Sequence, residues 1–423
     1  MAYLCVAAFD GFGASLQQPL IYVEAPALKL DGPERFPNGA TLKIATAGQS
    51  RVLVNGFAAT ADACVSFDGR RVLFAGKQSA GQRWQIWEMP ISGGVPRQVT
   101  NTSDDSIRPF YLPADKFVYA RRANGAFHLE ILTFDGKVAN RLSYAPGDQT
   151  PTDVLRDGRI LFEARRPDGA RELYTVYTDG TGVEAHRCDH RGDRVNGREL
   201  SNGDIIFETG GKLARFTSAR ATELPVEQPA GEFTGPIAEL DANEIIASYR
   251  AKPGEPFGLV RWKIGAAPVP LLSAKAASLL QPVVVRARPA PKWHPSAIGE
   301  RPGANLLCLN VYTSKERIAA GTVARVRLWT RDDAGMPAKL GEASVENDGS
   351  FYVMAPGEKP LRFELLNKAG AVVSAEKGWW WARTGEQRVC VGCHAGPERA
   401  PENRRPQILV HSTEPAKLFG GRQ

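Results

Sequence analysis

The sequence predicts an all-β protein in which a six-bladed β-propeller is followed by a small antiparallel β-sandwich. Three observations lead to this prediction. Short β-rich triplets recur through the first two thirds of the chain, at steps of 45, 43, 45 and 40 residues. A turn signal precedes each triplet, and a second strand-like run follows it. Beyond residue 304, strand-like runs continue without that period.

Five triplets carry the repeat. They are VLF at 72–74, FVY at 117–119, ILF at 160–162, IIF at 205–207 and IIA at 245–247. A period of about 40–45 residues with several strands in each unit is typical of propeller blades, because one small sheet cannot bury both of its faces alone. PLIYVEAP at 19–26 matches an earlier unit and the ring closes near 281–289, so we count six units. A run of β-hairpins in a sandwich is the alternative interpretation.

The chain is predicted to contain five segments. The proline-rich passage VRARPAPKWHPSAIGERPG indicates an extended linker between two β-rich regions. After it, alternating runs such as TVARVRLWTR, separated by Gly, Asn and Asp turns, favour an antiparallel sandwich. The predicted segments are an N-terminal segment at 1–18, the propeller at 19–290, the linker at 291–303, the sandwich at 304–388, and a cysteine motif with an irregular tail at 389–423.

Charge and hydropathy argue against two classes of function. The net charge is +7, but no run of five Lys or Arg residues occurs. The basic surplus therefore indicates a solvated surface, and no nucleic-acid partner is expected. No stretch of eighteen apolar residues occurs, so no transmembrane segment is predicted. The start, MAYLCVAAFDGFG, lacks a basic n-region, so a signal peptide is not evident in this chain.

The segment QRVCVGCHAGPE, residues 387–398, contains the most specific motif of the chain. Cys390 and Cys393 lie three residues apart, and His394 follows directly. Two thiols at this spacing can bind one porphyrin through thioethers while the histidine binds the iron, so the motif predicts one covalent haem c. Half of a zinc site and a redox dithiol are the alternatives, but the second ligand pair and the βαβ context that they need are missing.

Two further groups of residues are weaker metal candidates. His186, Cys188 and His190 alternate in EAHRCDHRG, and on a strand they would point to one side, where they could bind zinc. A polar loop without a ligand role is the alternative. His294 and Cys308 flank the linker and are candidates to lie near the edge of the haem, with the 186–190 group next. The sixth iron ligand is left open.

Three consecutive tryptophans, 379–381, precede the cysteine motif in WWWAR. In an extended segment, Trp379 and Trp381 would share one face and Trp380 would take the other. Aromatic side chains at this place could form a wall of the haem site, and ordinary core packing is the alternative.

Two family resemblances follow from these residues. FDGRRVLF and DGRILFEARR resemble TolB-type propeller repeats, and LLCLNVYTS, DGSFYVMAPGEKPLRFELLNKAG and WWWARTGEQRVCVGCHAGPE resemble proteins related to the hydrazine synthase alpha subunit. The second resemblance implies an exported, haem-c-bearing redox protein. In that subunit a tyrosine four residues after the motif histidine binds the iron, and Glu398 stands at the matching position here. His394 is therefore expected to be the iron ligand, and hydrazine synthesis itself is not predicted.

Two functional hypotheses remain. The first is an exported mono-haem c-type cytochrome-like protein that performs electron transfer or, as an oxidoreductase subunit, haem redox chemistry within a larger complex. The second is a propeller binding module with a sensory or structural haem. Both place the protein in the periplasm or outside a bacterial cell, because haem c is attached there. Both also imply a redox partner or complex subunits.

Overall fold

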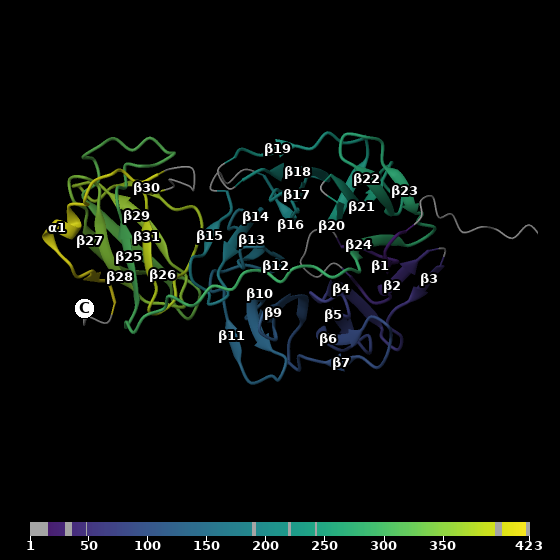
Figure 1. The fold of residues 1–423 in the computed structure, drawn as a ribbon. Helices are drawn as coiled ribbons and strands as arrows, with labels where there is room; N and C mark the ends of the chain where they lie inside the picture. The colour runs from purple at the N-terminus through teal and green to yellow at the C-terminus, as the bar shows by residue number, and fades with distance from the viewer. Residues whose placement is uncertain are drawn as a thin grey trace, which may run out of the picture. The chain divides into compact units, whose positions relative to one another are not determined.

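The computed structural model describes residues 16–29, 36–47, 49–187, 192–218, 221–241, 243–393 and 400–419. These residues form thirty-two strands and one four-residue helix, α1 (Ile408–His411), so the all-β prediction is confirmed (Figure 1). The chain divides into two compact units. One unit consists of Met1–Tyr111, Arg198–Arg215 and Leu224–Pro289, and the other of Leu112–Gly197, Phe216–Glu223 and Ala290–Gln423.

Strands β1 to β24 form six four-stranded sheets, in which neighbours along the chain are mostly neighbours in the sheet. The first sheet contains β24 (Ser278–Val284), β1 (Leu20–Ala25), β2 (Thr41–Thr46) and β3 (Gln49–Val52). The second contains β4 (Ala59–Val65), β5 (Arg71–Lys77), β6 (Gln85–Pro90) and β7 (Arg97–Gln98). The third sheet contains β8 (Ser106–Leu112), β9 (Lys116–Ala123), β10 (Ala126–Thr133) and β11 (Ala139–Arg141). The fourth contains β12 (Gln149–Val154), β13 (Ile160–Arg165), β14 (Arg171–Val176) and β15 (Glu184–Ala185). The fifth sheet contains β16 (Val195–Glu199), β17 (Ile205–Thr209), β18 (Lys212–Phe216) and β19 (Leu224–Pro225). The sixth contains β20 (Glu232–Asp241), β21 (Glu244–Arg250), β22 (Gly258–Lys263) and β23 (Val269–Leu272).

The predicted triplets lie in the second strand of each sheet from β5 onward. Val72, Leu73 and Phe74 in β5 are completely buried, and Ile160, Leu161 and Phe162 in β13 are buried to the same extent. When small sheets pack face against face, both faces of each inner strand are buried. These runs are therefore continuously apolar and do not alternate with polar residues.

One sheet joins the two ends of this region. Strand β24 pairs antiparallel with β1, so residues near 280 lie beside residues near 20. A contact between sheets reinforces this closure. Asp62, at a bulge in β4, donates its backbone N–H to Gln281 Oε1 over 2.9 Å, and Gln281 Nε2 donates to Asp62 Oδ1 over 2.7 Å. Both residues have a positive φ, of 57° and 52°, and both lie where their ladders shift register.

Strands β25 to β32 form two further four-stranded sheets that enclose one apolar core. One sheet contains β31 (Gln387–Cys390), β25 (Ala304–Cys308), β28 (Phe351–Ala355) and β32 (Ala416–Lys417), and the other β27 (Pro337–Ser344), β26 (Arg325–Arg331), β29 (Arg362–Leu366) and β30 (Val372–Ala375). Burial alternates along β26 and β28, as a sheet with one core face requires.

The prediction of a purely antiparallel sandwich is wrong at two strand pairs. Strand β31 pairs parallel with β25, and β32 pairs parallel with β28. Parallel neighbours need a long crossover, whereas a hairpin gives an antiparallel pair. About eighty residues separate β25 from β31, so no local turn signal sets their direction.

We predict that Gln281→Ala lowers the unfolding free energy by about 1–3 kcal/mol, because it leaves the partly buried Asp62 carboxylate and backbone N–H without these partners. Urea unfolding followed by tryptophan fluorescence measures this change. Gln98→Ala, at an exposed residue with one hydrogen bond to Thr100 O, is the control and should have a much smaller effect. Equal midpoints for the two variants would contradict the proposed importance of this contact.

Candidate functional site

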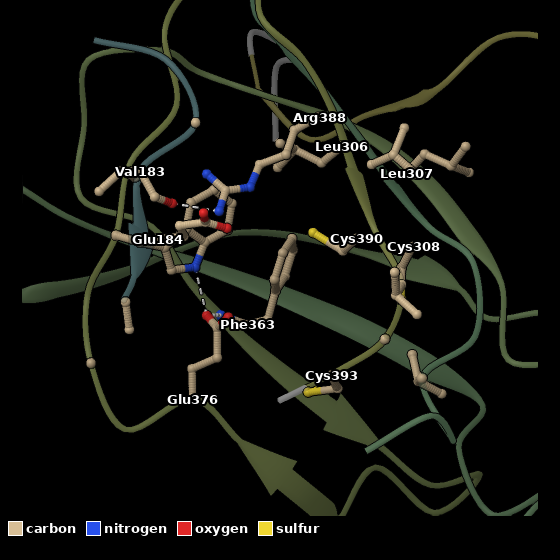
Figure 2. A pocket seen from close by; sticks show the side chains of 18 of the residues that line it. Val183, Glu184, Leu306, Leu307, Cys308, Phe363, Glu376, Arg388, Cys390 and Cys393 are labelled. Carbon is tan, nitrogen blue, oxygen red and sulfur yellow. Dashed lines mark hydrogen bonds between the residues drawn. The ribbon is translucent and has the colours of Figure 1, made fainter. Parts of the chain in front are cut away.

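A cavity of about 490 Å³ opens beside β31 in the second unit. Apolar and aromatic side chains form most of its wall, and two cysteines of the predicted motif lie on it (Figure 2). Cavities of this size and composition are typical of sites for small ligands and cofactors. The lining residues are Tyr174, Tyr177, Gly182–Ala185, Leu306–Cys308, Val311, Phe351, Phe363, Leu365, Glu376–Trp380 and Arg388–Cys393.

Pairing between β25 and β31 places the thiols. Cys390 is the last residue of β31 and lies opposite Cys308 in the register of the two strands. Cys393 follows in a turn and packs against the sandwich core. The structure therefore brings Cys308, Cys390 and Cys393 together at one cavity. His394, the predicted iron ligand, lies outside the described residues.

Gly392 fixes the turn between the two motif cysteines. A Cβ atom at this position would lie 2.0 Å from Thr313 O and 2.8 Å from Asn310 O. Those carbonyls belong to the turn that follows β25, so the motif is packed directly on neighbouring backbone. Only glycine fits there without displacing the main chain.

Arg388 brings a positive charge to the cavity. Its Nη2 donates to Val183 O over 2.5 Å, and its guanidinium carbon lies 5.0 Å from the centre of the Trp380 ring. Figure 2 shows the hydrogen bond to Val183 and the proximity of Cys390. Nη1 is buried and finds no acceptor among the described residues. Burial raises the pKa of the Cys390 thiol, and the Arg388 charge opposes that effect.

The three tryptophans do not alternate as predicted. Trp379 and Trp380 both line the cavity, while Trp381 is only 2% exposed and donates from Nε1 to Gly180 O over 3.3 Å. Trp380 forms one isolated bridge with Leu361, so this segment is not a regular strand. Glu376 holds Trp380 in place by accepting a hydrogen bond from its Nε1 over 2.7 Å.

The second predicted metal group is only partly described. Strand β15 ends at Ala185, so His186 lies outside the strand, as the interpretation of this segment as a loop requires. His186 is buried, its ring lies 5.6 Å from that of Phe216, and its Nε2 has no hydrogen-bond partner in the part of the chain described. Cys188 and His190 lie outside the described residues. Within the described ranges, no cluster of three His, Cys, Asp or Glu residues suits a metal ion.

The structure separates the two candidates that flank the linker. Cys308 lines the cavity, but His294 is exposed and does not. His294 Nε2 contacts Asp157 O, and its ring lies 5.1 Å from the ring of Tyr177, which does line the cavity. Whether either lies near an iron atom stays a prediction.

Sequence reasoning missed Arg388, Glu376 and the segment 182–185. Arg388 had a usable signal, because residues i and i+2 of a strand share one face and Cys390 is two positions further on. Residues 182–185 had none, since they are about 200 positions from the motif in the sequence.

Comparisons with known proteins show which proteins this chain is similar to. Residues 316–395 match the family described as the hydrazine synthase alpha subunit middle domain. Hydrazine synthase subunit alpha of Kuenenia stuttgartiensis is 25% identical over 209 residues, which are 46% of this chain but only 24% of that subunit. An uncharacterized protein of Agrobacterium fabrum is 25% identical over 197 residues, which are 45% of this chain and 67% of that protein.

Two solved structures share the fold. The structure of Kuenenia stuttgartiensis hydrazine synthase has a TM-score of 0.82 at 16% identity, covering 93% of this chain and 71% of that one. TolB from Acinetobacter baumannii has a TM-score of 0.50 at 14% identity, covering 64% and 68%.

Fold and site together define an all-β protein that joins TolB-like propeller sheets to a β-sandwich module. The chain is related to the alpha subunit of hydrazine synthase, as the sequence resemblance predicted. Among the described residues, no helix has the length and apolar character needed to cross a membrane.

We predict that Gly392→Ala destabilises the haem-free protein by about 1–3 kcal/mol, because the added methyl group must push the motif turn away from Thr313 O. Thermal unfolding measures the effect. Gly81→Ala is the matched control, since a Cβ there meets no atom within 4 Å and the φ is not positive. An unchanged melting temperature for Gly392→Ala would show that the turn is not packed as described.

The pH dependence of stability should report on His186. Burial and the nearby charge of Arg159 lower the pKa of His186 from 6.5 to about 4. Between these values the unfolded chain binds a proton that the folded chain does not, so acidification favours unfolding. This contribution to stability is complete above pH 6.5 and is lost as the pH falls toward 4, by about 3 kcal/mol at most.

His186→Phe should reduce that loss while keeping an aromatic contact with Phe216. Urea unfolding at pH 7 and pH 5 measures the difference. Gln98→Ala, at an exposed residue whose side chain does not titrate, is the control. If His186→Phe and the unaltered protein lose equal stability between the two pH values, the expected titration is absent.

Proposed function

We propose that this chain is a haem c protein that performs electron transfer or haem redox chemistry within a larger assembly. The observation that carries the proposal is the position of Cys390 and Cys393 on the wall of one apolar cavity, at the spacing that thioether attachment requires. The relationship to a hydrazine synthase subunit supports the assignment to a redox assembly.

The described residues fit a haem. The cavity is of suitable size and has an apolar wall, and the motif turn rests against backbone that admits only Gly392. Nη1 of Arg388 is buried without a hydrogen-bond acceptor among the described residues, and a polar group of a bound ligand would accept from it. Cys390 and Cys393 would hold the group covalently, and His394 would bind the iron.

When bound, the haem would supply one-electron chemistry at its iron. The chain supplies a fixed and mostly dry surrounding. Phe363, Trp379 and Trp380 exclude water, which shifts a reduction potential through the local dielectric. Glu376 accepts hydrogen bonds from Trp380 Nε1 and from the Phe363 backbone N–H, at 2.7 and 2.8 Å, and so keeps two of these wall residues in place.

The first 290 residues would serve as the docking platform of the assembly. We propose that their six sheets form a six-bladed ring. The β24–β1 pairing, which brings the ends of this region together, and the likeness to TolB support this arrangement. A haem attached through thioethers also places the mature protein outside the cytoplasmic membrane, where a redox partner or further subunits would meet it.

Haem staining after denaturing electrophoresis tests the attachment. We expect the full chain, produced with haem c maturation machinery, to stain, and the Cys390→Ala/Cys393→Ala variant to lose the stain completely. Cys64→Ala alters a buried cysteine in β4 and should keep it. Stain that persists in the double variant, or is missing from the unaltered chain, would contradict the proposal.

The reduced spectrum with and without carbon monoxide separates the two functional hypotheses. An electron-transfer haem with both axial positions filled should not change. A shifted spectrum would instead favour the binding module with a sensory haem.

A further inference from the structure

Three cysteines that form no disulfide meet at the cavity, one more than haem attachment uses. Cys308, Cys390 and Cys393 are all unbridged in this structure. Cys308 is 3% exposed and belongs to the sandwich core, whereas Cys390 is partly exposed. The motif accounts for Cys390 and Cys393, so the position of Cys308 calls for a separate explanation.

The geometry of Cys308 and Cys390 suits a covalent bridge. They are direct partners in the parallel ladder of β25 and β31, and Leu309 N donates to Cys390 O over 2.9 Å just beyond them. Neighbouring strands lie about 4.8 Å apart, and in-register partners project to the same face of the sheet. A disulfide needs Cα atoms about 4.4–6.8 Å apart, so these backbones require no rearrangement.

Cys393 is the competing partner for Cys390. Its approach depends on the turn at 391–393, and Gly392 in that turn is packed against Thr313 O and Asn310 O. The turn therefore has little space to tighten toward β31, whereas the β25–β31 ladder already holds Cys308 opposite Cys390.

We propose that Cys308 and Cys390 form a disulfide in the haem-free chain, which makes Cys308 a modification site that competes with haem for Cys390. The oxidant is a disulfide, either a small molecule or the active site of a thiol oxidase. Cys390, the more exposed thiol, attacks one oxidant sulfur, forms a mixed disulfide and releases one thiol. Cys308 then attacks the Cys390 sulfur and releases the second thiol, so two thiols are oxidised and one disulfide is reduced.

The bridge would block covalent attachment at Cys390 until a reductant cleaves it. Competition with haem rests on the proposed function, whereas the disulfide itself does not. A chain that stains for haem but never bridges would refute only the disulfide, and a chain that bridges but never stains would refute only the haem assignment.

Peptide mapping of the haem-free chain tests the proposal. The full chain is produced without haem maturation machinery, equilibrated with oxidised and reduced glutathione, alkylated and digested with trypsin. Cys308 then lies in peptide 293–315, and both motif cysteines lie in peptide 389–399. We expect these peptides to be joined in most of the chains, and dithiothreitol to separate them.

Single variants identify the partner. The cross-link should persist in Cys393→Ser and in the control Cys64→Ser, and should disappear in Cys390→Ser, Cys308→Ser and Cys308→Ala. Circular dichroism of each variant verifies folding. A disulfide within peptide 389–399, a cross-link that survives in Cys390→Ser, or unlinked peptides in the folded chain would each overturn the proposal.

Discussion

The parallel pairing of β31 with β25 is the constraint on which the candidate site depends. Four residue pairs, from Asn305–Gln387 to Cys308–Cys390, set the position of the motif against the sandwich. A slip of one residue would turn Arg388 and Cys390 to the opposite face, since side chains alternate along a strand. The ladder therefore sets which side chains of β31 lie on the same side of the sheet as Cys308.

Charge at the cavity is arranged around the same strand. Arg388 is held by the Val183 carbonyl and the Trp380 ring, and Trp380 is held by Glu376. A partly buried guanidinium costs solvation free energy, which these contacts offset only in part because Nη1 lacks an acceptor among the described residues. Nη1 of Arg388 is thus one of several buried polar atoms without a partner among the described residues.

Local sequence signals predicted the repeat and the two motif thiols. The remaining features of the site depend on contacts between distant segments and could not be predicted in the same way. Turn residues followed by β-branched and aromatic runs are encoded within a few positions, so β5 and β13 fell where their triplets indicated. The spacing of Cys390 and Cys393 is equally local. The direction of β31 and the approach of Val183 depend on contacts between distant segments, for which the sequence has no periodic signal. For His186 the sequence allowed either a strand or a polar loop, and the ladder ends one residue earlier, at Ala185.

The segment that follows the motif has a structural role of its own. Asp348 Oδ2 and Ser350 Oγ accept hydrogen bonds from the backbone N–H groups of Gln407 and Ile408, at 2.9 and 3.0 Å. Further on, Leu418 is buried in the sandwich core. The chain is thus anchored to the sandwich on both sides of residues 391–406, at β31 and at Gln407 and Ile408, which lowers the entropic cost of holding Cys390 and Cys393 in place. A thiol tethered in this way meets its reaction partner at a high effective concentration, without needing tight binding of that partner beforehand.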